Sequence, residues 1–262
     1  MMRSLYTAAT GMDAQQTKMD TIANNLANAN TTGFKKSRAD FEDLLSETIR
    51  SPGAPAAQGG SMPVPLQVGL GVRTSGTSRT FSQGDYSQTD NPLDLAIQGD
   101  GLFRITQPNG EYGYTRAGNF KIDAEGRLVT QRGELIEPQI TVPKDTTRLS
   151  ISEQGVVSVE TSGTQGKPTE LGQLELCTFV NPAGLEAIGG NLFIETSASG
   201  QPIIGRPGEQ GAGTILQSAL ESSNVKAVEE MVAMISTQRS YELNSKVIQT
   251  ADQMLQKLSN LR

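Results

Sequence analysis

Both ends of this 262-residue chain carry a spacing of apolar residues that is typical of long amphipathic helices. Near the N-terminus such residues recur every seventh position: Leu5, Met12, Met19 and Leu26, with Ala8, Ile22 and Ala29 beside them. Toward the C-terminus they step by three or four positions: Val228, Val232, Ile235, Leu243, Val247, Ala251, Met254, Leu258 and Leu261. The first pattern has the a/d spacing of a coiled coil. Since helices at both ends can pair with each other and with neighbouring copies, the pattern predicts a self-assembling structural protein. Its expected assembly interface consists of Leu5, Met12, Met19, Ile22, Leu26, Val228, Val232, Ile235, Leu243, Val247, Met254, Leu258 and Leu261.

The region between the ends has a different pattern, in which short alternating runs are separated by turn signals. We expect hairpin turns at Asn109-Gly110, at 123–126, at Gln154-Gly155 and at Ser199-Gly200. Strands do not alternate with helices here, which argues against a parallel nucleotide-binding sheet. The predicted fold class is therefore α+β, with long N- and C-terminal helices packed as a coiled-coil-like domain. The central domain is expected to be antiparallel and mainly β, as a small sandwich or barrel.

These patterns divide the chain into three parts. Residues 1–33 and 216–262 form the predicted helical assembly domain, 34–72 an extended connecting region, and 73–215 the central β domain. The connecting region contains a Pro- and Gly-rich run at 51–65, whose prolines are Pro52, Pro55, Pro63 and Pro65. Because proline lacks a backbone N–H, we expect this run to be a loop or an extended hairpin and not a helix.

Composition excludes several classes of function. The chain has 22 basic and 28 acidic residues, no His and one Cys. This balance disfavours a nucleic-acid binder, and its densest basic cluster, Lys35, Lys36 and Arg38, is interpreted as a solvated loop. Without His, the common nucleophilic pairs and nearly all zinc chemistry are absent. Cys177 lies in the apolar run LELCTFV and is expected to be a buried strand residue.

An enzyme is also disfavoured by where the acidic residues lie. Asp90, Asp94, Asp100 and Asp123 each sit beside a Gly, Asn or Pro turn signal, so turn chemistry accounts for them. No phosphate-binding loop or calcium loop is present in the sequence. We therefore expect no catalytic, metal or cofactor site. No apolar run reaches the length of a membrane span, and no cleaved secretory signal is expected.

Three stretches resemble the bacterial flagellar rod and hook protein family. SLYTAATGMDAQQTKMDTIANNLANANTTGFK resembles the N-terminal signature of that family, and SNVKAVEEMVAMISTQRSYELNSKVIQTADQML resembles its C-terminal counterpart. The central NPLDLAIQGDGLFRI, followed by YTRAGNFKIDAEGRLVTQRG, resembles the β domain that rod and hook proteins share. Residues 47–73 resemble the insert that distinguishes distal rod subunits from hook subunits.

This resemblance implies a straight, rigid, hollow tube that transmits motor torque to the hook and encloses an export channel. The terminal helices would form the inner wall and the β domain would face outward. The implied partners are copies of the chain itself, proximal rod subunits, hook subunits, peptidoglycan and outer-membrane ring proteins, a rod cap and the type III export apparatus. The implied location is the periplasm-spanning rod of the basal body, reached without a cleaved signal peptide. Neither nucleic acid nor membrane insertion is implied.

Two alternatives stay open at this point. Within the family, the chain could be a proximal rod or hook-type axial subunit, although the insert argues against the first and the absence of room for an outer domain against the second. A self-associating surface adhesin with helical stalk ends belongs to a different class. Straight tubes in the electron microscope would favour the rod, and a discrete trimer with a ligand patch would favour the adhesin.

Overall fold

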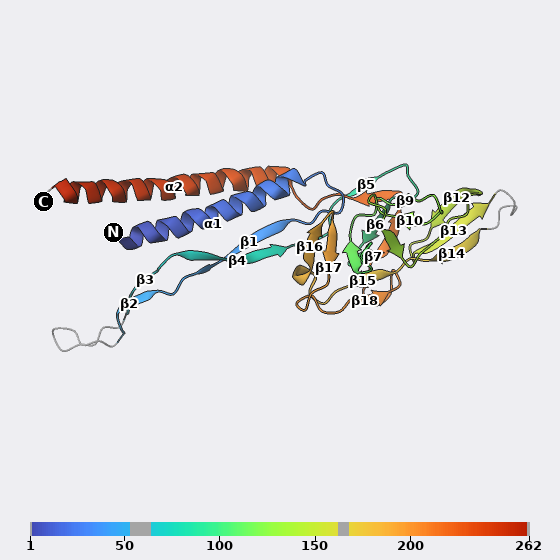
Figure 1. Cartoon of the computed structure of the whole chain (residues 1–262), viewed down its shortest axis with the longest axis horizontal. Helices are drawn as coiled ribbons and strands as arrows, with labels where there is room; N and C mark the ends of the chain where they lie inside the picture. Colours follow the sequence, from blue (N-terminus) through green and yellow to red (C-terminus); the bar gives the residue numbers. More distant parts are fainter. Residues whose placement is uncertain (1, 53–63, 162–167, 261–262) are drawn as a thin grey trace. The chain divides into compact units, whose positions relative to one another are not determined.

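The computed structural model describes residues 2–52, 64–161 and 168–260, and its contacts divide the chain into two compact units (Figure 1). Unit 1 comprises Met1–Leu26, Ser37–Ser78 and Ala227–Arg262. Unit 2 comprises Ala27–Lys36 and Arg79–Lys226. The chain therefore passes from one unit to the other near residues 27, 37, 79 and 227.

Unit 1 is built on the two terminal helices, α1 (Met2–Ala27) and α2 (Ala227–Asn260). The first contains many Ala, Met and Gln residues and no proline, which favours a helix. The second carries Glu229 and Glu230 in its first turn and Lys257 in its last, where each charge suits the helix dipole. No helix in the described part of the chain is long and apolar enough to cross a membrane.

Two strand pairs complete unit 1 as an arm. One pair is β1 (Ser37–Asp43) with β4 (Val72–Arg79), and the other is β2 (Glu47–Arg50) with β3 (Leu66–Val68). The β2–β3 pair is antiparallel. The arm contacts α1, since the backbone N–H of Val72 donates to Thr10 Oγ1 (3.4 Å).

Unit 2 contains one large sheet in which every pairing is antiparallel. Its nine strands are β16 (Glu186–Gly189), β17 (Leu192–Ile194), β8 (Tyr112–Thr115), β7 (Leu102–Thr106), β11 (Leu135–Glu137), β10 (Leu128–Val129), β9 (Lys121–Ile122), β15 (Leu176–Thr178) and β18 (Ile203–Gly205). Strand β7 lies at its centre and pairs with β8, β11 and β15.

Unit 2 also contains smaller antiparallel sheets of two or three strands. They are β12 (Thr146–Ile151), β13 (Val156–Thr161) and β14 (Thr169–Gln173) as one sheet, β6 (Leu95–Gln98) with β19 (Thr214–Gln217), and β5 (Tyr86–Gln88) with β20 (Ala219–Glu221). A short 3₁₀ turn spans Pro182–Gly184. The α+β class, with terminal helices and a central antiparallel β region, is thus confirmed.

Two apolar clusters hold unit 2 together. The larger gathers residues from many of the strands: Leu95, Ile97, Phe103, Ile105, Phe120, Leu128, Ile136, Ile140, Ile151, Val157, Leu174, Leu176, Leu192 and Ile215. The smaller contains Leu102, Tyr114, Cys177, Phe179, Leu185 and Phe193. Cys177 is fully buried on β15, as expected, and burial raises the pKa of its thiol to about 11. Most of the protein's buried apolar surface therefore lies in the β region.

Three of the four expected hairpin turns are confirmed. The backbone N–H of Gly110 donates to Gln107 O between β7 and β8, and equivalent bonds at Gly126 and Gly155 join β9 to β10 and β12 to β13. The hairpin expected at Ser199-Gly200 is wrong: β17 pairs with β16 and β8, whereas β18 pairs with β15. A turn forms there, but it joins strands that are not neighbours.

The C-terminal region also departs in detail from its sequence pattern. The helix was expected from about Asn224, led into by ILQSALESSNV, and it begins at Ala227. The preceding residues Thr214–Gln217 and Ala219–Glu221 are strands of unit 2 that pair with β6 and β5. Ile215 is buried in the larger core cluster, so tertiary burial decides the conformation of this segment.

Gly118 offers a test of how tightly unit 2 is packed. Its carbonyl accepts from the N–H of Leu95, and a Cβ at this position would overlap the backbone of Leu95. We expect Gly118→Ala to lower the free energy of unfolding by about 1–3 kcal/mol, because a backbone neighbour cannot move aside. Denaturant titration followed by circular dichroism measures the change.

The matched control is Gly76→Ala on β4, where nothing lies within 4 Å of the added carbon. It should leave the unfolding midpoint nearly unchanged. Equal effects of the two substitutions would show that the close approach at Gly118 is unimportant.

Candidate assembly interface

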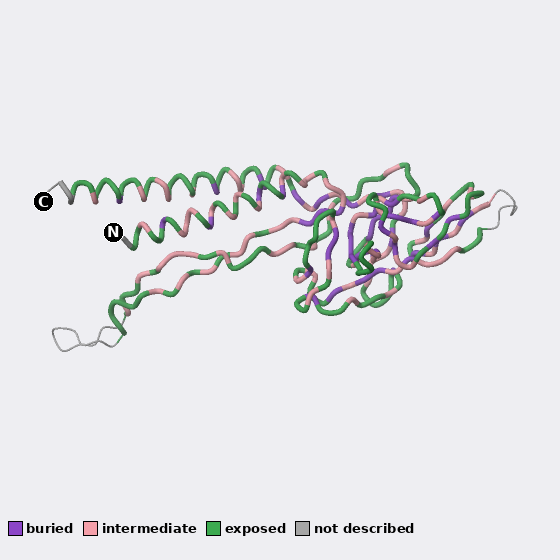
Figure 2. Tube along the Cα trace, viewed as in Figure 1, coloured by how far each residue is buried: buried purple, intermediate pink, exposed green. Residues whose placement is uncertain are grey.

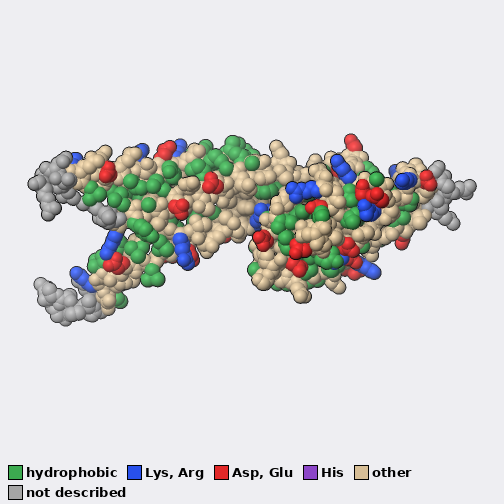
Figure 3. Space-filling view, in the orientation of Figure 1, with side chains coloured by type: hydrophobic (Ala, Val, Ile, Leu, Met, Phe, Trp, Pro, Cys, Tyr) green, Lys and Arg blue, Asp and Glu red, His purple; other side chains and the backbone are tan. Residues whose placement is uncertain are grey.

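Most of the apolar residues predicted as an interface on α2 lie on the surface of the subunit. Six of them, here called the outer seam, keep between 45% and 70% of their surface exposed: Val228, Val232, Ile235, Leu243, Val247 and Met254. Figure 2 shows exposed residues along most of this helix, and Figure 3 shows apolar side chains gathered over the helical part of unit 1. Contiguous apolar surface of this kind marks an interaction site.

Part of the outer seam is hollowed into a shallow groove. Its volume is about 310 Å³, and it is lined by Val232, Ile235, Ser236, Arg239, Ser240 and Leu243. The groove is mostly apolar, with one guanidinium and two hydroxyls beside it. Such a surface fits an apolar side chain of a partner helix better than a polar ligand.

The opposite face of α2, here called the inner face, packs against α1 and contains half-buried apolar residues, such as Met234 and Ile248, beside a line of polar or small ones. It includes Glu230, Thr237, Asn244 and Ala251, which recur every seventh residue. The first two and Ala251 are buried. The Nδ2 group of Asn25 donates to Glu230 Oε2 (3.2 Å), which joins the two helices directly. The helix pair thus buries a polar contact within the subunit and leaves the outer seam exposed.

On α1, the predicted residues are more sheltered than on α2. Leu5, Met12, Met19 and Leu26 are half-buried, and Ile22 is buried. Helix α1 contacts α2 through Asn25 and the arm through both Asn25 and Thr10, so two neighbours cover it (Figure 1). Its apolar residues contribute to the fold of unit 1 more than those of α2 do.

The structure describes only some of the remaining predicted residues. Ala251 is buried, the side chain of Leu258 lies outside the described residues, and Leu261 lies outside them altogether. In the Pro-rich run, Pro52 is exposed and Pro65 half-buried. Pro55 and Pro63 fall outside the described residues.

The arm adds apolar surface at residues that are not part of the predicted interface. Leu45 is 87% exposed, and Ile49, Val64 and Leu66 each expose more than half of their surface. All four lie on or beside β2 and β3. Alternation in such short strands is a weak signal, so periodicity did not identify Ile49, Val64 or Leu66 as interface residues.

A buried ion cluster lies in unit 2, on the segments that lead to the helices. Glu221 Oε1 accepts from Lys35 Nζ (2.7 Å) and Glu221 Oε2 from Arg116 Nε (2.5 Å). All three side chains are nearly inaccessible to water. The prediction of a solvated basic loop was therefore wrong for Lys35: its partner Glu221 is 186 positions away, and no local pattern reveals such a pairing.

Hydrogen bonds satisfy the rest of the cluster. Lys35 Nζ also donates to Ser82 O (2.8 Å), and the Arg116 guanidinium donates to the carbonyls of Ile97, Gly99 and Gly101. Burial alone would raise the pKa of Glu221, but the charge and hydrogen bond of Arg116 and the Lys35 bond hold it below its ordinary value. Burial lowers the pKa of Lys35, and Glu221 opposes that shift.

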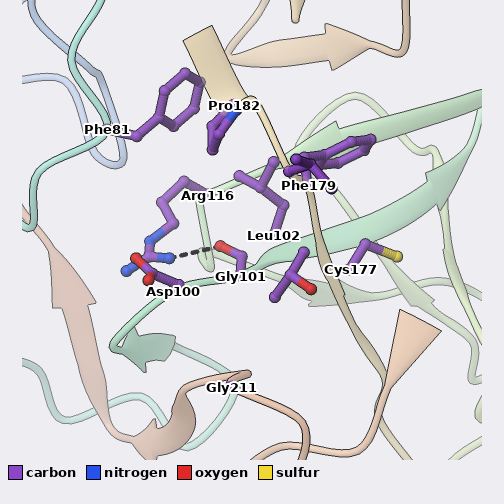
Figure 4. Close-up of a pocket in the computed structure, with 11 residues that line it drawn as sticks. Phe81, Asp100, Gly101, Leu102, Arg116, Cys177, Phe179, Pro182 and Gly211 are labelled. Carbon is purple, nitrogen blue, oxygen red and sulfur yellow. Dashed lines mark hydrogen bonds between the residues drawn. The ribbon is translucent and has the colours of Figure 1, made fainter. Parts of the chain in front are cut away.

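The same arginine borders a pocket of about 300 Å³ in unit 2 (Figure 4). Apolar side chains line most of it: Phe81, Leu102, Phe179, Val180 and Pro182. Asp100 and Arg116 are its charged residues, and Arg116 is already held by Glu221 and three carbonyls. Among the described residues no three His, Cys, Asp or Glu side chains gather as metal ligands would.

Models of three protein families match this chain in order along its length. Residues 5–35 match "Flagella basal body rod protein", residues 96–159 match "Flagellar hook protein FlgE/F/G D1 domain", and residues 216–261 match "Flagellar basal body rod FlgEFG protein C-terminal".

Curated relatives match over the whole chain. The flagellar basal-body rod protein FlgG of Borreliella burgdorferi is 52% identical over all of this chain and 99% of its own length. The FlgG proteins of Caulobacter vibrioides and Buchnera aphidicola subsp. Acyrthosiphon pisum are 51% and 50% identical, each over the full length of both chains.

Removing the acidic member of the ion cluster tests its structural role. Glu221→Gln leaves Lys35 and Arg116 buried without a counter-charge, so the free energy of unfolding should fall by about 3–5 kcal/mol. Urea titration followed by circular dichroism measures it.

Glu125→Gln is the control, since the ion pair of Glu125 with Arg127 is exposed and is expected to contribute about 0–1 kcal/mol. A Glu221 variant as stable as this control would contradict the assigned role.

Proposed function

The chain belongs to the flagellar basal-body rod and hook protein family, and we propose from this premise that it builds the distal rod by burying its outer seam against other copies of itself. It is a structural subunit of the flagellar rod and not an enzyme, and it belongs to the basal body. The proposed polymer is a straight, rigid, hollow tube that transmits torque to the hook and encloses the export channel.

The observation that carries the proposal is the exposure of the outer seam. Six large apolar side chains of one helix are at least 45% exposed in the single chain. Full burial of such a side chain returns about 1.5–3 kcal/mol, so burying the exposed half of each would return about 1 kcal/mol. A helix that is apolar on a face its own subunit does not cover is buried by something else. Neighbouring copies supply that cover in the proposed tube.

We propose the residues predicted from the sequence as the assembly interface, with the outer seam as its main part. On α1, Leu5, Met12, Met19 and Leu26 are half-buried, and the exposed parts of their side chains would contribute to the interface. A coiled-coil-like packing of the two helices, within and between copies, is part of this proposal. The exposed Leu45, Ile49, Val64 and Leu66 of the arm are proposed as a second contact surface between copies.

The domain division predicted from the sequence remains a proposal. In it, 1–33 and 216–262 serve assembly, 34–72 connects, and 73–215 faces outward. The stretch 47–73, with Pro52, Pro55, Pro63 and Pro65, is proposed to keep the tube straight by packing against adjacent subunits. Proline fixes one backbone angle, so a proline-rich contact resists bending better than a freely jointed one.

The specific partners are proposals as well. Proximal rod subunits would lie below this tube and hook subunits above it. Ring proteins of the peptidoglycan and outer membrane would surround it, a rod cap would assist its growth, and the type III export apparatus would deliver its subunits. Family membership supports this set, since rod and hook proteins share the matched segments. Full-length similarity to basal-body rod proteins favours the rod over the hook alternative, and it leaves the adhesin alternative without support.

Charge substitution in the outer seam tests the interface. Leu243→Asp and Met254→Asp should leave the monomer folded, because both side chains are more than half exposed, but should abolish tube formation, because an unpaired charge would be buried. Sedimentation and electron microscopy at high protein concentration measure assembly, and circular dichroism checks the fold.

Gln249→Asp is the control on the same helix, at an exposed polar position outside the seam. It should still assemble. Normal tubes from either seam variant would show that these residues are not the interface.

Deletion of residues 51–65 tests the insert. The deleted protein should fold, because the described core residues all lie outside this run, and should form tubes of altered straightness or length. Curvature and length in electron micrographs, together with motility of cells that carry the deletion, are the measurements. Unchanged rods and unchanged motility would contradict the role of the insert.

A further inference from the structure

The contacts between α1 and α2 follow a strict register. Asn25 bonds Glu230, and a Cβ added at Gly11 would lie 2.9 Å from Asn244 Nδ2. Gly11 and Asn25 are separated by two heptads on α1, and Asn244 and Glu230 by two heptads in the opposite direction on α2. The helices are therefore antiparallel, and the two contacts belong to one register.

That register places a line of polar and small residues on both helices. On α2 it contains the inner face, where Glu230 is 2% and Thr237 1% exposed. Opposite Glu230 on α1 stands Asn25, and the heptad spacing puts Lys18, whose side chain is exposed, at the position facing Thr237. In coiled coils a buried polar pair lowers stability but selects one alignment, because every shifted alignment leaves its polar groups unpaired.

Asn25 is suited to this role because its amide is held in one orientation. Its Oδ1 accepts from the backbone N–H of Ser37 (2.9 Å), and its Nδ2 donates to Ser37 O (2.8 Å). The remaining Nδ2 hydrogen points to Glu230 Oε2. Since β1 begins at Ser37, one side chain ties α1, α2 and the arm to a single alignment.

Gly11 adds a second, steric condition. A Cβ there would meet the end of the Asn244 side chain, so the Asn244 amide lies directly over Gly11 at this point. A shift of one heptad would place Gly11 against Thr237 or Ala251 and would separate Asn25 from Glu230 by about 10.5 Å along the helix axis. Neither contact would survive such a shift.

We propose that the Asn25–Glu230 pair, supported by the close approach of Gly11 and Asn244, sets the register of the terminal helices and thereby decides which apolar residues of α2 remain outside. The register is a property of the single subunit. Its consequence for assembly rests on the proposed function: a shifted α2 would present a different set of side chains to the next copy.

Disulfide trapping in dilute, full-length monomer tests the register. In the native alignment Lys18 lies opposite Thr237, so Lys18→Cys/Thr237→Cys should crosslink on mild oxidation. Lys18→Cys/Asn244→Cys should not, because one heptad displaces the second Cα by about 10.5 Å, beyond the roughly 7 Å reach of a disulfide. The native Cys177 is buried with a raised pKa and does not compete.

The polar pair is then replaced in both crosslinking backgrounds. With Glu230→Leu, the ratio of the native to the shifted crosslink should fall about tenfold or more, since a factor of ten corresponds to only about 1.4 kcal/mol of alignment preference. With Glu230→Gln, which can still accept the Asn25 hydrogen bond, the ratio should stay near that of the unsubstituted pair. A contribution of Glu230 through its first-turn charge alone predicts that Gln and Leu behave alike.

Equal ratios with Leu and Gln would overturn the proposal, as would a prominent shifted crosslink with Glu230 in place. Circular dichroism identifies a variant that has lost its helices. In that case Asn25→Leu, read by the same ratio, takes its place: it removes the donor to Glu230 and should weaken the native crosslink, and an unchanged ratio would count against the proposal. Because trapping uses monomer, its outcome is independent of tube formation, which sedimentation of the same variants measures separately.

Discussion

The proposed assembly of this protein depends on apolar residues that one helix leaves exposed. Helix α2 keeps Glu230 and Thr237 inside the subunit and Val228, Val232 and Leu243 outside. In an ordinary surface helix the apolar side faces the core of its own molecule. Here the subunit core lies in the β region. The exposed apolar side chains of α2 would therefore contribute free energy only when another molecule buries them. In the proposed tube, contact with other copies buries them.

The buried polar contacts of the protein fix the relative positions of its segments more than they stabilise the fold. The buried cluster of Lys35, Arg116 and Glu221 desolvates three charges, and such clusters are often no more stabilising than apolar residues of the same volume. It does, however, join residues far apart in the sequence in one geometry. Asn25 does the same for the helices and the arm. A subunit that must repeat many times in a regular polymer needs a single shape, and directional bonds select one better than apolar packing does.

Much of this organisation could be predicted from the sequence, for identifiable reasons. Heptad spacing predicted the N-terminal helix and steps of three or four predicted the C-terminal one, while turn residues such as Asn109-Gly110 predicted three hairpins. These signals are local, so they can be detected in the sequence. The residues of the outer seam were also found by periodicity. Periodicity could not distinguish the covered face of α2 from the exposed one, since Met234 and Ile248 are as apolar as Val232 yet are half-buried. It also could not reveal the burial of Lys35, whose partner is distant in the sequence, or the pairing of β18 with β15, which depends on topology.

The burial of the only thiol, that of Cys177, limits the kinds of bond that can join subunits in a shaft. Cys177 is enclosed in the sheet of unit 2, and the chain has no other cysteine. Under oxidising conditions, native copies therefore cannot form disulfide bonds with one another. A shaft made in this way owes its endurance to reversible contacts alone, and acid, heat or a chaotrope should take it apart into intact polypeptides with no reductant present.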